Sequence, residues 1–222
     1  MIEPSKLQGI YEDKKKKAYY TLNLVPGVHV YDEKLVSEDG QEYREWNPRK
    51  SKLAAALMKE VSQIGIKPGS IVLYLGCSTG TTISHVSDIV GKSGFVFGVD
   101  IGPRVMREMV FVCEERTNIA PILANARDTQ LLGQRICQPD IVYQDLAQKD
   151  QVEIFLKNCS MFLKKGGFGL LFVKARSIDV TKSPRLIYAD IRKKLEQNIM
   201  IVDYRELDPL EKDHCVFVCK KQ

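Results

Sequence analysis

From Ser70 to the C-terminus, short apolar runs alternate with segments of helical periodicity, and this alternation restricts the fold more than any other feature. The longest apolar runs, 71–75 and 170–173, have the length of buried strands and fall far short of the ~18 residues of a membrane-spanning helix. Strands are predicted at 70–75, 95–99, 119–123, 140–143, 167–173, 199–207 and 214–219, and helices at 82–90, 104–115, 151–163 and 184–198. Apolar strands joined by helices predict an α/β fold, in which a mostly parallel sheet is covered on both faces and a final hairpin adds an antiparallel edge.

The first 45 residues follow a different pattern, because apolar and polar side chains alternate there in short pieces between turns. We expect strands at 18–24, 28–31, 34–36 and 42–45, which together form a small antiparallel β domain over residues 1–45. Asn47 and Pro48 then have the character of a helix N-cap and a first-turn proline, and predict a helix over 49–64. Residues 46–222 are long enough for one further domain.

Charge and cysteine content narrow the function classes only slightly. The chain has 33 Lys and Arg against 28 Asp and Glu, a net charge of +5 that permits a nucleic-acid partner without demonstrating one. The four lysines at 14–17 fit a solvated hairpin edge as well as an RNA contact. The six cysteines contain no Cys-x-x-Cys pair, so we expect neither a metal site nor a disulfide framework. The N-terminus lacks a signal-peptide pattern and no membrane segment is evident, so we expect a cytoplasmic protein.

Residues that follow the predicted strands are the candidates for function, because ligands of open parallel sheets bind beyond the carboxyl ends of the strands. Residues 76–82 form a loop of small side chains with the spacing Gly-x-x-x-Gly in place of the dinucleotide fingerprint Gly-x-Gly-x-x-Gly. Asp100 ends the next strand 24 positions after Gly76, at the separation where a carboxylate accepts hydrogen bonds from a ribose diol. Loop and carboxylate together favour nucleoside binding over a purely structural turn, and the spacing disfavours a dehydrogenase.

Polar side chains also follow the next three strands. Asn125 and Ala126 come after the third strand, where a side-chain amide can meet the edge of an adenine ring. Asp145 and Lys174 end the fourth and fifth strands, so an ion pair between them that faces the cleft is expected. Such a lysine can orient a reacting group or accept its proton, or the pair can simply tie two strands together, and the residues leave both interpretations open.

A histidine, the single tryptophan and two cysteines are expected to have structural roles and not functional ones. His85 is expected to be a packed or capping histidine, and Trp46, the single tryptophan, is expected to pack the two sheet units together. On the last predicted strand, Cys215 and Cys219 lie on the opposite face from His214, which favours two core thiols over metal ligands.

Several sequence blocks closely resemble the fibrillarin family, over nearly the whole chain from about Leu24 onward. The blocks are 43–54 (YREWNPRKSKLA), 73–76 with 80–88, 145–151 (DLAQKDQ), 174–179 (KARSID) and 208–214 (DPLEKDH). The glycine- and arginine-rich N-terminal segment of the eukaryotic members is absent, so the chain resembles the compact archaeal form.

This resemblance implies a class I, Rossmann-like methyltransferase domain in residues 46–222 that uses S-adenosyl-L-methionine to methylate ribose 2′-hydroxyls of rRNA, with tRNA as a further candidate. It implies work inside a box C/D ribonucleoprotein, with guide RNA, target RNA, a Nop-family scaffold protein and a kink-turn-binding protein as partners. An archaeal-type member is expected in the cytoplasm, and a eukaryotic one in the nucleolus. A guide–target duplex displays 2′-hydroxyls in its shallow minor groove, so the enzyme need not read bases. Since the basic excess is small, we expect the isolated chain to methylate RNA poorly.

The resemblance also assigns roles to residues at matching positions. The catalytic group maps to Lys52, Asp145, Lys174 and His214, with Lys174 steering or deprotonating the ribose hydroxyl and Asp145 holding that lysine. The cofactor positions are Gly76 and Cys77 in the glycine loop, Thr81 and Thr82 at the methionine end, Asp100 and Ile101 at the ribose, Asn125 and Ala126 at the adenine, and Asp145, Leu146, Ala147 and Gln148 near the sulfonium.

Three of these positions depart from the usual family residues, since Cys77 replaces an alanine, Asp100 a glutamate and Asn125 an aspartate. The amide of Asn125 offers one acceptor oxygen and no charge to an adenine amino group, so we expect weaker cofactor binding than in relatives. Two alternatives stay open: a structural subunit of the particle without turnover, and a methyltransferase of the same fold that acts on protein or on a small molecule.

Overall fold

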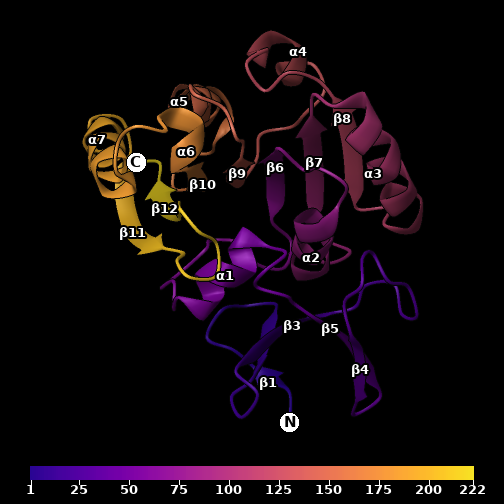
Figure 1. Ribbon diagram of the computed structural model, residues 1–222. Helices are drawn as coiled ribbons and strands as arrows, with labels where there is room; N and C mark the ends of the chain where they lie inside the picture. The colour runs from indigo at the N-terminus through magenta and orange to yellow at the C-terminus, as the bar shows by residue number, and fades with distance from the viewer.

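The computed structural model describes residues 1–222, which form two sheets of unequal size (Figure 1). The first sheet is antiparallel throughout, in the order β1-β2-β3-β5-β4. Its strands are β1 (Glu3–Pro4), β2 (Ile10–Asp13), β3 (Ala18–Leu22), β4 (Leu35–Glu38) and β5 (Gln41–Glu45). Residues 14–17 form the turn between β2 and β3, where the Asp13 carboxylate accepts hydrogen bonds from the N–H groups of Lys15 and Lys16. The four lysines therefore lie on a hairpin turn, as one of the two interpretations expected, and the other, an RNA contact, stays a prediction.

One predicted strand of this sheet is wrong, because residues 28–31 form a loop. The Glu33 carboxylate accepts hydrogen bonds from the backbone N–H groups of Val30 (3.0 Å) and Tyr31 (2.8 Å), and the His29 ring contacts the Glu33 carbonyl oxygen at 3.0 Å. These N–H groups are used within the loop and are not available to pair with a neighbouring strand.

The second sheet has seven strands in the order β11-β12-β10-β9-β6-β7-β8. They are β6 (Ile71–Leu75), β7 (Phe95–Asp100), β8 (Ile119–Leu123), β9 (Ile141–Asp145), β10 (Phe168–Lys174), β11 (Met200–Glu206) and β12 (His214–Lys220). Strands β6 to β10 run parallel to one another, and β12 lies antiparallel between β10 and β11. The predicted mostly parallel sheet with a closing antiparallel hairpin is confirmed.

Helices cover both faces of the second sheet. One face packs against α1 (Lys52–Met58), α2 (Thr81–Val90) and α3 (Pro103–Glu115), and the other against α4 (Thr129–Gly133), α5 (Gln151–Phe162) and α7 (Pro184–Glu196), while α6 (Ala175–Ile178) directly follows β10. Because side chains alternate along a strand, Tyr143 and Phe172 point to the first face, and Val142 and Leu171 to the second. None of the helices has the length and apolar character needed to span a membrane.

Helix α1 is shorter than the predicted helix over 49–64. Asn47 is not its N-cap, because its side-chain oxygen accepts a hydrogen bond from the N–H of Arg49 (2.9 Å) in a turn, and Ser51 caps the helix instead. Beyond the other end, Arg205 of β11 donates to the carbonyl oxygen of Glu60 (3.1 Å), a residue with φ of 55°. The chain is therefore held in a non-helical conformation directly after α1.

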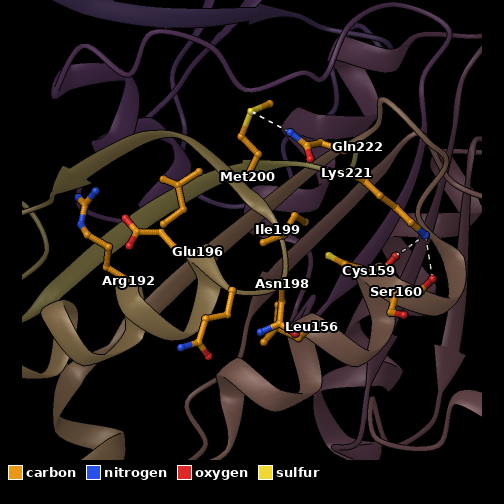
Figure 2. A pocket seen from close by; sticks show the side chains of 12 residues that line it. Leu156, Cys159, Ser160, Arg192, Glu196, Asn198, Ile199, Met200, Lys221 and Gln222 are labelled. Atoms are coloured by element: carbon orange, nitrogen blue, oxygen red, sulfur yellow. Dashed lines mark hydrogen bonds between the residues drawn. The ribbon is translucent and has the colours of Figure 1, made fainter.

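A hollow of about 720 Å³ lies between α5, α7 and the last residues of the chain (Figure 2). Beside it, the Lys221 ammonium donates to the carbonyl oxygens of Cys159 (3.0 Å), Ser160 (2.8 Å) and Leu163 (2.8 Å). These carbonyls end α5, so Lys221 caps that helix. None of the predicted site residues lines this hollow.

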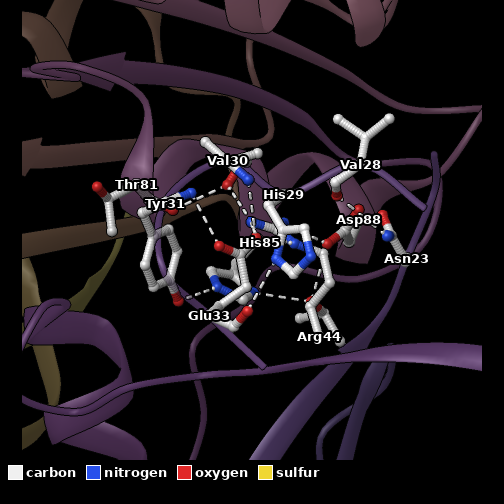
Figure 3. Close-up of polar contacts among 12 residues, drawn as sticks. Asn23, Val28, His29, Val30, Tyr31, Glu33, Arg44, Thr81, His85 and Asp88 are labelled. Carbon is white, nitrogen blue, oxygen red and sulfur yellow. Dashed lines mark hydrogen bonds and ion pairs between the residues drawn. The ribbon is translucent and has the colours of Figure 1, made fainter. Parts of the chain in front are cut away.

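Buried charges join the first sheet to α2 (Figure 3). Arg44 of β5 lies between two carboxylates, with Nε donating to Glu33 (2.7 Å) and Nη1 donating to Asp88 of α2 (2.8 Å). All three side chains have no exposed surface. Arg116 donates to the second oxygen of Asp88 at 2.5 Å. Burial raises the pKa of the Glu33 carboxyl, but the Arg44 charge and two backbone N–H groups outweigh it and hold that pKa below its usual value.

The same junction contains His85 of α2 (Figure 3). The Thr21 hydroxyl donates to Asp88 (2.8 Å), so its contact with Nδ1 of His85 (2.8 Å) is donated by the ring, and Nε2 accepts from the Tyr31 hydroxyl (2.6 Å). Burial lowers the pKa of His85 well below its usual value, in accord with this neutral ring. Trp46 stacks on the ring with centroids 4.6 Å apart. The structural interpretations of both residues are confirmed.

Candidate active site

The glycine loop lies where the strand order of the second sheet reverses. Strand β6 has β7 on one side and β9 on the other, and ligands of such sheets bind beyond the carboxyl ends at this point. Gly76 follows β6 with φ of 87°, and a Cβ atom there would lie 2.3 Å from the carbonyl oxygen of Asp145. Only glycine allows this approach, so the loop and the end of β9 lie in direct contact at this point of the sheet.

The loop continues into the first turn of α2. Gly80 is the N-cap, with φ of 107°, and no side chain caps the helix. The N–H groups of the first turn are therefore available to an anionic ligand group. Thr81 and Thr82 begin the helix, and the Thr82 hydroxyl donates to Ser51 Oγ at 3.0 Å. This bond ties α2 to the start of α1. Cys77 is buried beneath the loop.

Asp100 ends β7 and faces the same loop. One carboxylate oxygen accepts from the N–H of Ser78 (3.0 Å) and the other from the N–H of Gly102 (2.9 Å). A carboxylate has about four acceptor positions, so two remain for a ribose diol. Ile101, beside it, is 55% exposed, so its side chain is accessible to a ligand.

The loop after β8 holds Asn125 and Ala126. The side-chain oxygen of Asn125 accepts from the N–H of Arg127 at 3.0 Å, and the Ala126 carbonyl accepts from the buried Asn158 amide of α5 at 3.0 Å. One of the two lone pairs of the Asn125 side-chain oxygen is thus used by the backbone N–H of Arg127. The expectation of weak cofactor binding stays a prediction.

Residues 145–148 form the wall opposite the glycine loop. Leu146 packs partly into the core of the second face, and Ala147 is exposed. The side-chain oxygen of Gln148 is buried and has no hydrogen-bond partner. An unpartnered buried acceptor costs about 1–3 kcal/mol, so it fits a site whose ligand supplies a donor. Glycine cradle, ribose-type carboxylate and unpartnered acceptor together fit a charged nucleoside such as S-adenosyl-L-methionine.

The four predicted catalytic side chains gather over one face of the second sheet. Asp145 alternates in step with Tyr143, Lys174 with Phe172, and His214 with Val216, all on the face that α1 covers. Lys52 is the first residue of α1. Its ammonium donates to Asp145 at 2.9 Å, and the two side chains are 24% and 22% exposed. Ser51 and its bond to Thr82 fix the start of α1, and so place Lys52 above Asp145.

The predicted ion pair between Asp145 and Lys174 is wrong, because Asp145 pairs with Lys52. Asp145 lies opposite Phe172 in the parallel register of β9 and β10, so Lys174 stands two residues beyond the end of β9. Lys174 is exposed and forms no ion pair. It lies directly opposite His214 in the antiparallel pairing of β10 and β12, where side chains on one face are neighbours.

His214 and an acidic neighbour complete the group. Burial lowers the pKa of His214, although the bond from its Nδ1 to the Lys212 carbonyl (2.6 Å) opposes this. Burial raises the pKa of Glu211, against the effect of Lys52, and the Asp145 charge adds to the rise. The charges of Lys52, Asp145 and Lys174 affect the pKa of both Glu211 and His214, so all five side chains belong to one cluster. This environment disfavours the charged form of both groups, the imidazolium of His214 and the carboxylate of Glu211.

Sequence reasoning missed two polar residues here, Glu211 and Gln151. Glu211 stands in the block 208–214 that carried the family resemblance, three positions before His214, and that proximity was an available signal. Gln151 begins α5 and is fully buried, which no local pattern indicates. Among His, Cys, Asp and Glu side chains, the structure contains no group of three or more able to hold a metal ion. Cys215 and Cys219 are fully buried on the second face, as predicted.

Comparisons with known proteins agree over almost the whole chain. The family model described as Fibrillarin matches residues 2–222. A relative from Thermococcus onnurineus, "Fibrillarin-like rRNA/tRNA 2'-O-methyltransferase", is 47% identical over 224 residues and covers 99% of each chain.

Two solved structures are similar throughout. Fibrillarin of Aeropyrum pernix in complex with natively bound S-adenosyl-L-methionine has a TM-score of 0.90 and 41% identity, covering 99% of this chain and 97% of that one. A fibrillarin/Nop5p complex contains a chain with a TM-score of 0.89 and 33% identity, covering 99% of this chain and 100% of that one.

Proposed function

Because this chain belongs to the fibrillarin family, we propose that it is an S-adenosyl-L-methionine-dependent RNA 2′-O-methyltransferase that acts on ribose in rRNA and tRNA under the direction of box C/D guide RNA. The observation that carries this proposal is the joint placement of two sites. The nucleoside-type site formed by Gly76 and Asp100 lies beside Asp145, whose carbonyl oxygen Gly76 approaches, and Asp145 is also the acid of the Lys52, Lys174 and His214 cluster.

The cofactor supplies a methyl group already activated on a positively charged sulfur. Asp100 would accept from the ribose hydroxyls, the first turn of α2 would bind the carboxylate, and the Gln148 oxygen would accept from a donor of the ligand. The Asp145 carboxylate, paired with Lys52, would face the sulfonium and help to balance its charge. These residues bind and orient, and they need not change during the reaction.

The cluster of Lys52, Asp145, Lys174 and His214 has to orient the 2′-hydroxyl and to accept the proton that leaves its oxygen as the methyl–oxygen bond forms and the methyl–sulfur bond breaks. Lys174 is the candidate for this step, because it is exposed and has no carboxylate partner. As an ammonium it can orient the hydroxyl by donating a hydrogen bond to its oxygen, and only as the neutral amine can it accept the proton. Lys52 holds Asp145 in place from α1, whereas the family resemblance implied that Asp145 holds Lys174. His214 is neutral beside Lys174, so it does not repel the cation and can accept a hydrogen bond through Nε2.

Affinity for RNA is assigned to an assembly, since the net charge of +5 is small. The complex of a 33% identical fibrillarin with Nop5p supports a Nop-family partner. Guide RNA and a kink-turn-binding protein complete the particle that we propose, and the cytoplasm is its proposed location. The isolated chain would then bind the cofactor but methylate RNA slowly.

The proposal is tested by methyl transfer in a reconstituted particle. The chain is assembled with guide RNA, a Nop-family protein and a kink-turn-binding protein, and tritiated methyl transfer to a complementary target RNA is followed. Resistance of the modified linkage to alkaline hydrolysis identifies the 2′-oxygen. Lys174→Ala should reduce the rate at saturating cofactor by about 10²-fold or more, the usual effect of losing a proton-handling group.

Lys165→Ala is the matched control, because Lys165 is exposed in the turn before β10, at the opposite end of that strand from Lys174, and its replacement should leave the rate unchanged. Cofactor binding without any transfer to RNA would favour the structural subunit. Label that enters protein instead of RNA would favour a protein methyltransferase.

A further inference from the structure

Gln151, the first residue of α5, bridges the two halves of the candidate active site. Its side-chain oxygen accepts from the backbone N–H of Lys174 at 3.3 Å, and its side-chain nitrogen donates to the carbonyl oxygen of Gln148 at 2.7 Å. The side chain has no exposed surface. One buried amide therefore contacts both the cofactor wall 145–148 and the strand end that carries Lys174.

The bridge substitutes for a neighbouring strand at the point where one ends. The parallel pairing of β9 and β10 stops at Asp145 and Phe172, so β9 offers no partner to Lys174 two residues further on. The Gln151 oxygen takes the N–H of Lys174 instead. Strand β12 supports Lys174 on the other side, so loss of Gln151 would leave the strand end held on one side only, with the N–H of Lys174 unpaired. The Lys174 side chain would then be positioned less precisely.

Gln151 is itself held from the second face of the sheet. Gln144, the residue before Asp145, points to that face, and its side-chain nitrogen donates to the backbone carbonyl of Gln151 at 2.6 Å. Helix α5 is further fixed to the loop after β8, because Asp150, its N-cap, pairs with Arg127 of that loop, and Asn158 donates to the carbonyl oxygen of Ala126. The bridge therefore has a rigid base.

A primary amide is the side chain that this position requires. It donates through one atom and accepts through the other, whereas glutamate only accepts and methionine, of similar length, does neither effectively. We propose that Gln151 is a positioning residue for methyl transfer, which sets the place of Lys174 relative to the cofactor wall. This inference rests on the proposed function and adds a residue that acts through Lys174 without touching substrate.

The test is a double-mutant cycle in the reconstituted particle. Gln151→Met should lower the single-turnover rate at saturating cofactor by about 10²-fold, since a displacement of 1 Å can have an effect of that size. In a Lys174→Ala background, the same change should alter the remaining rate by no more than about twofold, the usual scatter between independent measurements. Gln151→Glu keeps the acceptor for Lys174 and loses the donor to Gln148, so it should give an intermediate rate.

Asn118→Leu is the matched control for lost buried hydrogen bonds. Its amide nitrogen donates to the carbonyls of Ser87 and Gly91 (both 3.0 Å) just before β8, at the opposite edge of the sheet. It should lower the thermal midpoint and leave the rate of the folded enzyme unchanged. If Gln151→Met lowered the rate by the same factor with and without Lys174, or stayed within twofold of wild type, the inference would be wrong. A wild-type particle that binds cofactor but transfers no methyl group would overturn the proposed function, and this inference with it.

Discussion

Replacement of Arg44 by methionine should weaken the attachment of the first sheet to α2 more than any other single substitution at that junction. Methionine keeps most of the side-chain length and removes the charge. Glu33 would then retain only two backbone N–H donors for a carboxylate with no exposed surface, while Asp88 would still be paired with Arg116. Removal of one partner from a buried ion pair costs about 3–5 kcal/mol.

This cost corresponds to a fall of roughly 6–20 °C in the thermal midpoint, at about 2–4 °C per kcal/mol for a chain of this size. Urea unfolding followed by tryptophan fluorescence is the direct assay, because Trp46 is the only tryptophan and stacks on His85 within the junction. Circular dichroism reports the secondary structure of the whole chain in the same samples, and most of that structure lies in the second sheet and its helices.

Two further variants separate lost charge compensation from lost packing. Adding Glu33→Gln to Arg44→Met should restore part of the loss, since it removes the uncompensated carboxylate. Arg176→Met is the control, because its pair with Asp213 is 42% and 21% exposed and should contribute less than about 1 kcal/mol. The reasoning fails if Arg44→Met costs no more than Arg176→Met, or if Glu33→Gln increases the loss.

Three other outcomes follow from the structure. Asn125→Asp should tighten cofactor binding measured by calorimetry by about fivefold, because a charged acceptor adds roughly 1 kcal/mol to a hydrogen bond; unchanged affinity would contradict the role assigned to Asn125. Gly76→Ala should abolish the thermal shift caused by cofactor, since its Cβ atom would lie 2.3 Å from the Asp145 oxygen, whereas Gly40→Ala, also at positive φ but with open space around it, should not. The free energy of unfolding should fall as the pH drops below about 6.5, because unfolded histidine binds a proton there that folded His85, with its lowered pKa, does not. In His85→Phe the free energy of unfolding should depend less steeply on pH over this range. An equally steep dependence in the variant would show that other titrating groups cause it.

The second sheet was predictable from sequence because its strands are short, apolar and regularly spaced, and burial on both faces leaves few alternatives. Helices α4 and α6 were not predicted, since five and four residues are too few to show periodicity. The loop at 28–31 reads as a strand by composition, but the Glu33 carboxylate, which is close in sequence, takes its N–H groups.

The site was predictable to the level of strand ends and no further. Residues that end parallel strands must share an edge, so Asp100 and Asp145 were found by position. The ion-pair partner of Asp145 could not be found by position, because it depends on which helix covers that face of the sheet and on where the helix begins. Lys52 is 93 positions away and reaches Asp145 through the Ser51 and Thr82 contact, which is purely tertiary. Gln151 is hidden for the same reason.

The place of β12 has a consequence for folding. This strand follows β11 in the chain, yet it lies inside the sheet between β10 and β11 and carries His214 at its start. A chain in which β12 has not yet inserted exposes the edge of β10 and leaves β11 without a pairing partner. The cluster of Lys52, Asp145, Lys174 and His214 therefore cannot form strand by strand in the order of the sequence, and it is complete only once β12 has inserted between two strands that precede it.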